Sequence, residues 1–210
     1  MARKRDAANG KHAEALAHLG RDRRMRALVE KVGPPTFHEY PTRDHLECLL
    51  VSIVSQQLSG KAAATIFERF RALAPRRFPD PRAILRLPDA ALRGAGLSRA
   101  KAASIRDLCE AVLRGRLDLG RLGSLPDDEV VEALVRVKGI GVWTAQMALI
   151  FTLGRPDVWP AGDLGVRKSL GRFLRLPEMP SPAEAEPLGD RWRPYRSYAA
   201  WYLWQFNDTK

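Results

Sequence analysis

The chain has 210 residues, 45% of them hydrophobic, and a formal net charge of +11 at pH 7. This length allows one compact unit or two small lobes with a real core. The positive charge is typical of nucleic-acid-binding proteins, although an Arg- and Ala-rich proteome would also produce it. Two cysteines, Cys48 and Cys109, provide neither a disulfide framework nor a cysteine metal site. Without a membrane-length apolar run or an apolar signal core at the start, we expect a cytoplasmic protein.

The predicted elements are all helices. A polar, basic, Ala-rich arm over residues 1–20 is expected to be partly frayed. Helices are then predicted over 22–32, 44–54, 61–73, 81–85, 89–92, 98–114, on both sides of a turn at 138–141, and over 163–174 and 195–206, with a Pro-rich link at 177–187. Ser98 is expected to cap one helix, and Asp127 or Asp128 to cap the helix before the turn. No stretch alternates with period two between turns, so we expect an all-α protein.

The turn itself is Val137-Lys138-Gly139-Ile140-Gly141. Before it, Val130 and Leu134 fall at helical spacing, and after it Ala145 and Leu149 do the same. Glycines permit backbone conformations that a Cβ would obstruct, so N–H groups at the start of the second helix can approach an anion closely. Such a turn predicts binding to a phosphate backbone, a contact that carries no base-sequence information. Any helical hairpin could, however, contain a Gly-x-Gly turn.

A second motif, Pro160-Ala161-Gly162-Asp163, places a carboxylate 22 residues beyond Gly141. Together the two motifs resemble the helix-hairpin-helix DNA glycosylase superfamily, and within it the 3-methyladenine DNA glycosylase II (AlkA-type) branch. The resemblance covers nearly the whole chain after residue 20. It implies two helical lobes with a DNA-binding cleft between them, one over 45–155 and the other formed by 21–44 with 156–210. The β-rich N-terminal domain of larger members is expected to be absent, because the helical region begins almost at once.

Asp163 is the candidate catalytic residue. Breaking an N-glycosidic bond builds positive charge on the sugar, and a carboxylate facing C1′ can stabilise that charge or help position and deprotonate water. The alternative is an ordinary N-cap for the helix that begins at Leu164. The two interpretations are compatible, because a capping position also fixes the direction of the carboxylate.

The chain departs from the glycosylases that also cut the DNA backbone. In those relatives a lysine lies two residues after the second hairpin glycine, where this chain has Trp143. Neither Lys138 nor Lys168 matches that position, and a lyase needs an amine nucleophile. The resemblance therefore implies a monofunctional hydrolase that leaves an abasic site.

An aromatic base pocket is implied by the same branch. Trp143 and Trp204 match its pocket aromatics, and an indole attracts the positive charge of a methylated purine. Met147 stands where some relatives have a tyrosine, which makes the expected pocket softer and less polar. Trp143 could instead be a core tryptophan between helices, and Trp201 and Tyr198, at helical spacing near Trp204, could simply be core residues.

The polar loop Gln56-Gln57-Leu58-Ser59-Gly60 interrupts two helices. In the resemblance it inserts a side chain into the duplex where the flipped nucleotide was, which offsets part of the cost of flipping. Gln57 and Leu58 are both candidates for this wedge, and a plain polar connection is the alternative.

Contacts to the DNA backbone are expected around the hairpin. The predicted residues are Lys138, Gly139, Gly141, Val142 and Thr144. Arg99, Lys101, Arg167 and Lys168 are further cations, each of which is more often a solvated surface charge.

No cofactor is expected to be required, but the hairpin of relatives holds a structural monovalent cation, Na⁺ or K⁺. Here its ligands would be the main-chain carbonyls of Val135, Val137 and Ile140. The iron–sulfur cluster of the endonuclease III branch is excluded, because it needs four cysteines. The histidines form no metal-binding pattern.

The favoured function is a monofunctional DNA-3-methyladenine glycosylase. It would remove alkylated purines such as 3-methyladenine and 7-methylguanine by base flipping, in base excision repair. The implied partner is double-stranded DNA with alkylated bases, bound by a monomer at the bacterial nucleoid and away from any membrane. Two alternatives stay open: a glycosylase for uracil, hypoxanthine or an oxidised purine, and a non-catalytic helix-hairpin-helix DNA-binding module.

Overall fold

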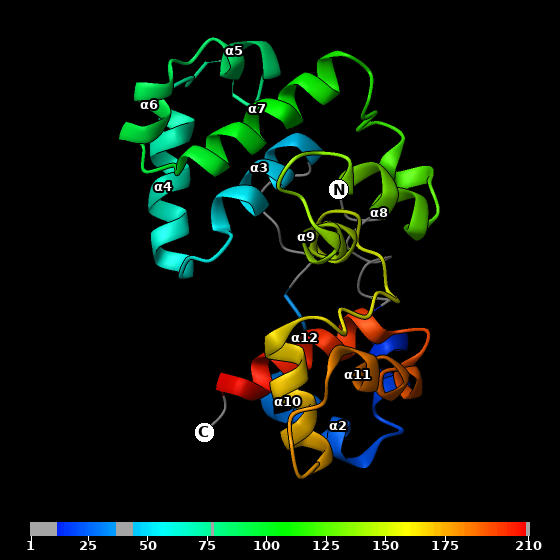
Figure 1. Ribbon diagram of the computed structural model, residues 1–210. Coiled ribbons are helices and arrows are strands. Elements are labelled where there is room, and N and C mark those ends of the chain that lie inside the picture. The colour runs from blue at the N-terminus through cyan, green and yellow to red at the C-terminus, as the bar shows by residue number, and fades with distance from the viewer. Residues whose placement is uncertain (1–11, 37–43, 77, 209–210) are drawn as a thin grey trace. The chain divides into compact units, whose positions relative to one another are not determined.

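A computed structural model describes residues 12–36, 44–76 and 78–208. The chain divides into two compact units, one over residues 40–153 and the other formed by 1–39 with 154–210. We call the first the central unit and the second the terminal unit. Figure 1 labels most of their helices, with the chain coloured from blue at the start to red at the end.

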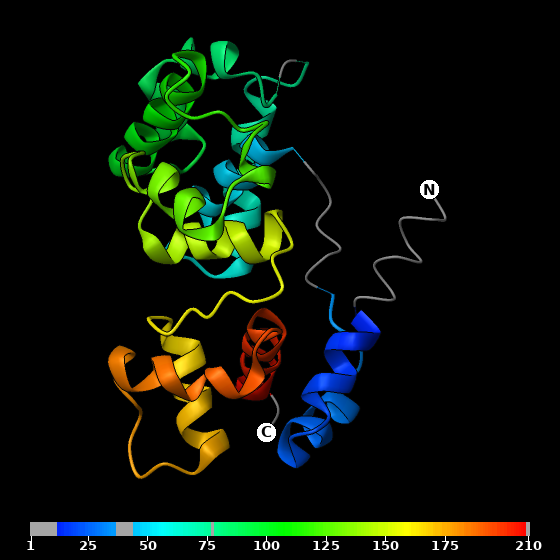
Figure 2. The same ribbon diagram turned by 90° about the vertical axis from the view of Figure 1, so that its right-hand side faces the viewer.

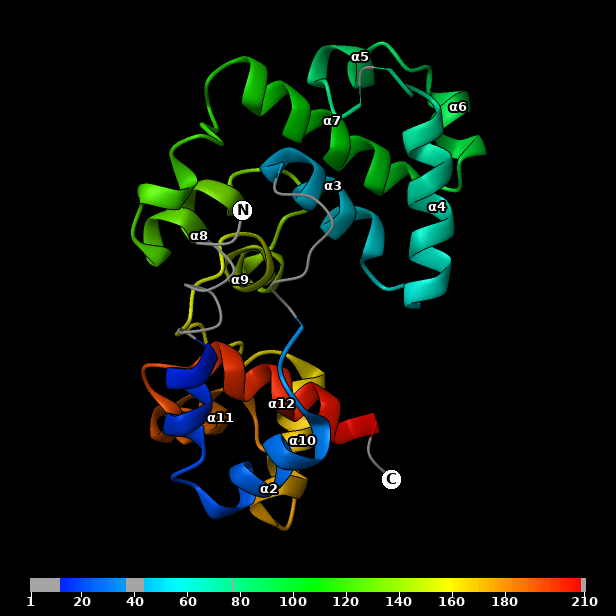
Figure 3. The same cartoon turned by 180° about the vertical axis from the view of Figure 1, so that it is seen from behind.

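The central unit is built from helices of 3 to 15 residues. Its elements are α3 (His45–Ser55), α4 (Gly60–Ala72), α5 (Pro81–Leu85), α6 (Asp89–Gly94), α7 (Arg99–Leu113), η1 (Leu122–Ser124), α8 (Asp127–Val135), α9 (Val142–Met147) and η2 (Ala148–Thr152). η2 is a π-helical turn that continues α9 directly. Figure 3 shows α7 passing behind α3, with α4 and α6 at one end of it and α8 at the other.

The core of the central unit follows from the apolar faces of α3 and α7. Leu50 and Ile53 of α3 are fully buried, as are Ile105 and Leu108 of α7. Burial of such a side chain contributes roughly 1.5–3 kcal/mol relative to leaving it exposed. Cys109 is also fully buried, and burial raises the pKa of its thiol to about 12. It is therefore a reduced core residue.

The terminal unit contains helices from both ends of the described chain. Its elements are a helix over 12–19, α2 (Arg23–Val32), α10 (Leu164–Leu174), α11 (Pro182–Leu188), η3 (Asp190–Trp192) and α12 (Arg196–Asp208). α12 packs against both α10 and α2. Tyr202 of α12 donates a hydrogen bond to the carbonyl of Gly33 at 2.9 Å, and Arg24 of α2 donates one to the carbonyl of Phe173 at 2.9 Å. Figure 2 shows the long loop that connects α10 with α11.

The all-α prediction is confirmed for the described residues, in which every regular element is a helix. Several predicted boundaries hold because short polar side chains cap the helices. Asp22 accepts hydrogen bonds from the amides of Arg24 and Met25, and Ser98 accepts one from the amide of Lys101 at 3.2 Å.

Two local predictions are wrong. Helix α8 is capped by Pro126 without a side-chain hydrogen bond, while Asp127 and Asp128 lie in its first turn, where their charge favours the positive end of the helix. The expected Pro-rich link contains helix α11, which begins with Pro182 after a capping box formed by Ser181 and Glu184.

The expected N-terminal arm is helical where the structure describes it. In the helix over 12–19, Ala15 and Leu19 are fully buried. The rest of that prediction, over residues 1–11, lies outside the described residues. Along the described ranges no helix combines the length and apolar character needed to cross a membrane.

Candidate active site

The hairpin turn lies between α8 and α9, and only one of its glycines has a left-handed backbone. Gly139 has φ +79°, which L side chains rarely adopt, and an added Cβ would lie 2.1 Å from Ser104 Oγ. Gly141 caps α9 with φ −94°, and nothing lies within 4 Å of the place its Cβ would take. Gly139 therefore shapes the turn, and Gly141 leaves open space beside the start of α9.

The amides of the turn are divided between internal and outward roles. Lys138 N–H donates to Asp107 Oδ2 at 2.7 Å, so this amide is already engaged. That hydrogen bond is the main reason why the pKa of Asp107 is lowered. Helix geometry leaves the first amides of α9 without partners within the helix, and Val142 is exposed there. The start of α9, rather than the amide of Lys138, thus suits an anion.

Thr144 is a predicted backbone contact whose side chain faces the protein. It is 3% exposed, and its Oγ1 accepts a hydrogen bond from Gln56 Nε2 at 3.3 Å. The same Nε2 donates to the carbonyl of Gly139 at 2.9 Å. Gln56 therefore ties the loop between α3 and α4 to the hairpin, across 83 residues of sequence.

The loop between α3 and α4 presents both wedge candidates. Gln57 and Leu58 are exposed, and Gln57 has φ +57°. Such a conformation costs on the order of 1–2 kcal/mol in a residue with a Cβ. Lys101 Nζ of α7 donates to the carbonyls of Val54 at 2.7 Å and Gln56 at 2.9 Å, and burial lowers its pKa. Lys101 therefore fixes the position of this loop, in contrast to the solvated surface cation that the sequence suggests.

The predicted base-pocket residues of the central unit lie on α9, four residues apart. Trp143 is 44% exposed, whereas Met147 is 8% exposed. Trp143 thus offers a large apolar surface beside the hairpin, and Met147 belongs mainly to the core of its unit.

Asp163 and Trp204 belong to the terminal unit. Asp163 caps α10, because its Oδ1 accepts the amide of Val166 at 2.7 Å. The same oxygen accepts the indole N–H of Trp204 at 2.9 Å. The capping interpretation is therefore correct, and the cap and Trp204 together fix the direction of the carboxylate. The two cations expected on α10 have different environments. Arg167 Nε donates to the carbonyl of Pro180 at 2.8 Å, whereas Lys168 is exposed.

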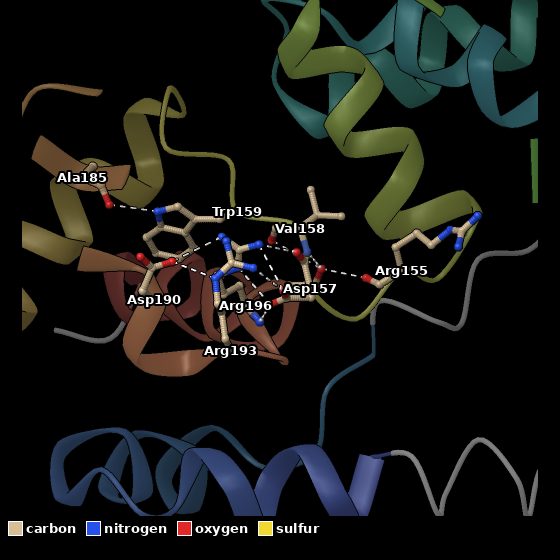
Figure 4. Close-up of polar contacts among 9 residues, drawn as sticks. Arg155, Asp157, Val158, Trp159, Ala185, Asp190, Arg193 and Arg196 are labelled. Carbon is tan, nitrogen blue, oxygen red and sulfur yellow. Dashed lines mark hydrogen bonds and ion pairs between the residues drawn. The ribbon is translucent and has the colours of Figure 1, made fainter. Parts of the chain in front are cut away.

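The segment before Asp163 is anchored by residues that the sequence did not single out. Asp157 pairs with Arg196, and Trp159 is buried with its indole N–H donating to the carbonyl of Ala185 at 2.9 Å. Figure 4 shows these contacts. Similar long-range contacts involve Gln56, Asp107 and Arg196, each of which binds a partner 31 to 83 residues away in the sequence. A local sequence pattern therefore does not predict these contacts.

The carbonyls predicted to hold a monovalent cation lie in or beside the hairpin. The carbonyl of Val137 accepts the amide of Ile140 at 3.1 Å, which leaves its second lone pair for another partner. Over residues 12–36, 44–76 and 78–208, no three His, Cys, Asp or Glu side chains are grouped to hold a metal ion.

Comparison with known proteins identifies the family. The HhH-GPD superfamily of base excision DNA repair proteins matches residues 50–194. The alkylbase DNA glycosidase-like protein mag2 of Schizosaccharomyces pombe is 34% identical over 198 residues, which cover 92% of this chain and 93% of that protein. The chain therefore belongs to the HhH-GPD superfamily, and the predicted family is confirmed.

Solved structures show the same fold. S. pombe 3-methyladenine DNA glycosylase (Mag1), in complex with abasic DNA, matches with a TM-score of 0.81 and 36% identity, over 91% of this chain and 95% of that one. DNA-3-methyladenine glycosidase from Bacillus halodurans matches with a TM-score of 0.79 and 36% identity, over 91% of this chain and 88% of that one. The predicted helix-hairpin-helix glycosylase fold is thus confirmed.

Proposed function

We propose that this chain is a monofunctional DNA glycosylase that removes alkylated purines, such as 3-methyladenine and 7-methylguanine, from double-stranded DNA in base excision repair. The observation that carries the proposal is the Asp163 carboxylate, held at the start of α10 by Val166 and Trp204 in a chain of the HhH-GPD superfamily. The substrate class is supported by the names of its relatives, which include 3-methyladenine glycosylases at 36% identity.

Asp163 acts on the sugar. As the bond between C1′ and the purine nitrogen breaks, its electron pair leaves with the base and the sugar becomes cationic. The carboxylate stabilises that charge, and water then adds at C1′ and loses a proton. The products are a free base and an abasic site in an uncut strand.

Trp143 has two roles in the proposal. Its exposed indole stacks on the flipped base, with cation–π attraction of about 0.5–2 kcal/mol for a positively charged methylpurine. It also occupies the position where bifunctional relatives have their lysine, so no Schiff base forms there. Met147 supplies an apolar wall behind it, and Trp204 holds Asp163.

The remaining predicted residues serve DNA binding. A phosphate binds at the start of α9, to the backbone of Gly141, Val142 and Thr144. The side chain of Lys138 adds positive charge there. Gln57 or Leu58 fills the place of the flipped nucleotide.

A hairpin cation completes the proposed interface. Na⁺ or K⁺ would be held by the carbonyls of Val135, Val137 and Ile140, whose oxygen chemistry suits such ions, and would add positive charge near the phosphate. We assign no other cofactor. The proposed site of action is the cytoplasm, at the nucleoid, as a monomer on DNA.

The test is product analysis on methylated duplex DNA. Released bases are identified by mass, strands are analysed before and after alkali, and borohydride is added to trap any Schiff base. We expect 3-methyladenine and 7-methylguanine in solution, strand breaks only after alkali, and no trapped adduct. Release of uracil, hypoxanthine or an oxidised purine alone, from a panel of such duplexes, would contradict the substrate class. DNA binding without release of any base would indicate a non-catalytic binding module.

A further inference from the structure

Helix α12 contacts the Asp163 segment at two points. Near its start, Arg196 and Ser197 bind residues 155–158, and two turns later Trp204 binds Asp163. Ser197 and Trp204 are seven residues apart, which places them on the same side of the helix, about 10 Å apart along its axis. One helix therefore aligns both ends of the segment that carries the proposed catalytic residue.

The first contact is an ion pair with extra hydrogen bonds. Arg196 is 8% exposed, and its Nε and Nη2 donate to Asp157 Oδ1 at 2.8 Å and Oδ2 at 3.1 Å. Nη2 also reaches the carbonyl of Asp157 at 3.0 Å. Figure 4 shows Arg193 and Arg196 converging on this aspartate. A bidentate guanidinium–carboxylate pair fixes orientation as well as distance.

Both the hydroxyl and the amide of Ser197 form hydrogen bonds with the same segment. Its Oγ donates to the carbonyl of Arg155 at 2.7 Å and accepts the amide of Val158 at 2.9 Å. Its own amide donates to the carbonyl of Pro156 at 3.0 Å. Consecutive residues of the segment are thus bound to the first turn of α12.

The second contact acts on the carboxylate itself. Trp204 Nε1–H and the amide of Val166 both donate to Asp163 Oδ1, at 2.9 Å and 2.7 Å. Two donors on one oxygen, from different helices, restrict rotation of the carboxylate group and so direct Oδ2. The arrangement presents an edge of the indole to Asp163, whereas a pocket wall uses the face of the ring.

Gly165 provides the space that this contact needs. A Cβ on Gly165 would lie 3.1 Å from Asp163 Oδ1 and 3.1 Å from Trp204 Cδ1. Both distances are tighter than ordinary van der Waals contact, so a methyl group here would require the indole or the carboxylate to shift by a few tenths of an ångström. An alanine would otherwise be favoured over glycine within a helix.

We propose that Trp204 is a positioning residue, which orients the Asp163 carboxylate toward the sugar cation through its indole N–H. Gly165 provides the space for this contact, and the Asp157–Arg196–Ser197 cluster holds α12 against the segment that carries Asp163. This inference rests on the proposed function, because it assigns Asp163 to a cationic sugar.

The direct test is Trp204→Phe, which keeps an aromatic ring and removes the donor. We expect the single-turnover rate of base release to fall on the order of 10- to 100-fold, the range for losing a hydrogen bond to a charged group. Trp192→Phe is the matched control. Among the described residues the indole nitrogen of Trp192 has no hydrogen-bond partner, so this change removes no such bond. It should lower thermal stability but keep the rate, measured well below both melting temperatures.

A binding measurement separates positioning from a merely structural role. Duplexes carry either a neutral tetrahydrofuran or a cationic pyrrolidine in place of the damaged nucleoside, and Kd is measured for each. The wild type should prefer the cation, and Asp163→Asn should lose that preference. Trp204→Phe should bind the neutral analogue within about twofold of wild type and lose most of the preference for the cation. An equal weakening for both analogues, or an unchanged preference, would overturn the inference.

Gly165→Ala tests the contact between Trp204 and Asp163 by reducing the space around it. We expect its melting temperature to be unchanged or higher, while its rate and its cation preference fall. Gly94→Ala, in α6 with nothing within 4 Å of its Cβ position, should leave both unchanged. A fully active Gly165→Ala would overturn the inference. If the wild type released no alkylated base and did not prefer the cation, the proposed function itself would fail, which is a different outcome.

Discussion

Of the two hairpin glycines, only Gly139 is constrained by its own backbone and surroundings. Gly139 has a left-handed backbone and an added Cβ would overlap Ser104 Oγ, whereas Gly141 has an ordinary φ and open space beside it. The sequence indicates both as parts of one motif, because Gly-x-Gly carries no information on which residue has positive φ. In the structure Gly139 shapes the turn, and the proposed function places the approach of a phosphate beside Gly141.

These roles predict opposite outcomes for two alanine variants. Gly141→Ala should fold with an unchanged melting temperature and bind duplex DNA more weakly, because the new methyl group obstructs the phosphate. Gly139→Ala should destabilise the central unit by about 1–2 kcal/mol from the backbone strain alone, and by more from the overlap with Ser104. Calorimetry and DNA titrations at fixed salt measure both effects. Normal DNA binding by Gly141→Ala would refute the proposed approach of a phosphate at this glycine.

Residue contacts across long stretches of sequence could not be predicted. The sequence indicates Asp163 and Trp204 separately, by their motifs, but their hydrogen bond joins residues 41 apart. The sequence places Gln56 in the polar loop and Lys101 among the expected cations, but their contacts follow only from the carbonyls that the fold brings to them. Side-chain patterns report a residue's own element, whereas these contacts depend on how elements pack.

At the scale of elements, the sequence predicts helices best where a cap and an apolar face agree. Ser98 before α7 satisfies both conditions, and the predicted start is confirmed. The sequence predicts a link in place of α11 because of its prolines, although Pro182 occupies the first turn, where proline is tolerated. The signal that could have found it is the capping box, with Ser181 three residues before Glu184.

The packing of α11 predicts a sensitive position at its end. An added Cβ on Gly189 would lie 2.4 Å from Trp159 Cε2, and Trp159 is buried against Trp192 with ring centroids 5.6 Å apart. Gly189→Ala should therefore destabilise the terminal unit by about 1–3 kcal/mol, the usual cost of overpacking. Chemical denaturation measures this change, with Gly94→Ala as a control of small effect. Unchanged stability would show that Trp159 is free to move away from this glycine.

At the scale of the whole molecule, the fold class and the family follow from sequence. A net charge of +11 agrees with a DNA-binding protein, and the HhH-GPD match to residues 50–194 covers both the hairpin and Asp163. The structure adds that each unit holds its own proposed functional residues in place. Gln56 and Asp107 support the hairpin within the central unit, and α12 supports Asp163 within the terminal unit.

In the proposed function, the negative charge of Asp163 stabilises the sugar cation and so promotes base release. Asp163→Asn keeps an oxygen that can accept the hydrogen bonds of Val166 and Trp204, so it removes the charge and preserves the cap. The most direct measurement compares the single-turnover release of methylpurines by this variant and the wild type, together with their affinities for the same duplex. We expect release to fall on the order of a hundredfold or more, with affinity for undamaged duplex retained. Release at the wild-type rate by Asp163→Asn would show that this negative charge is not required for base release.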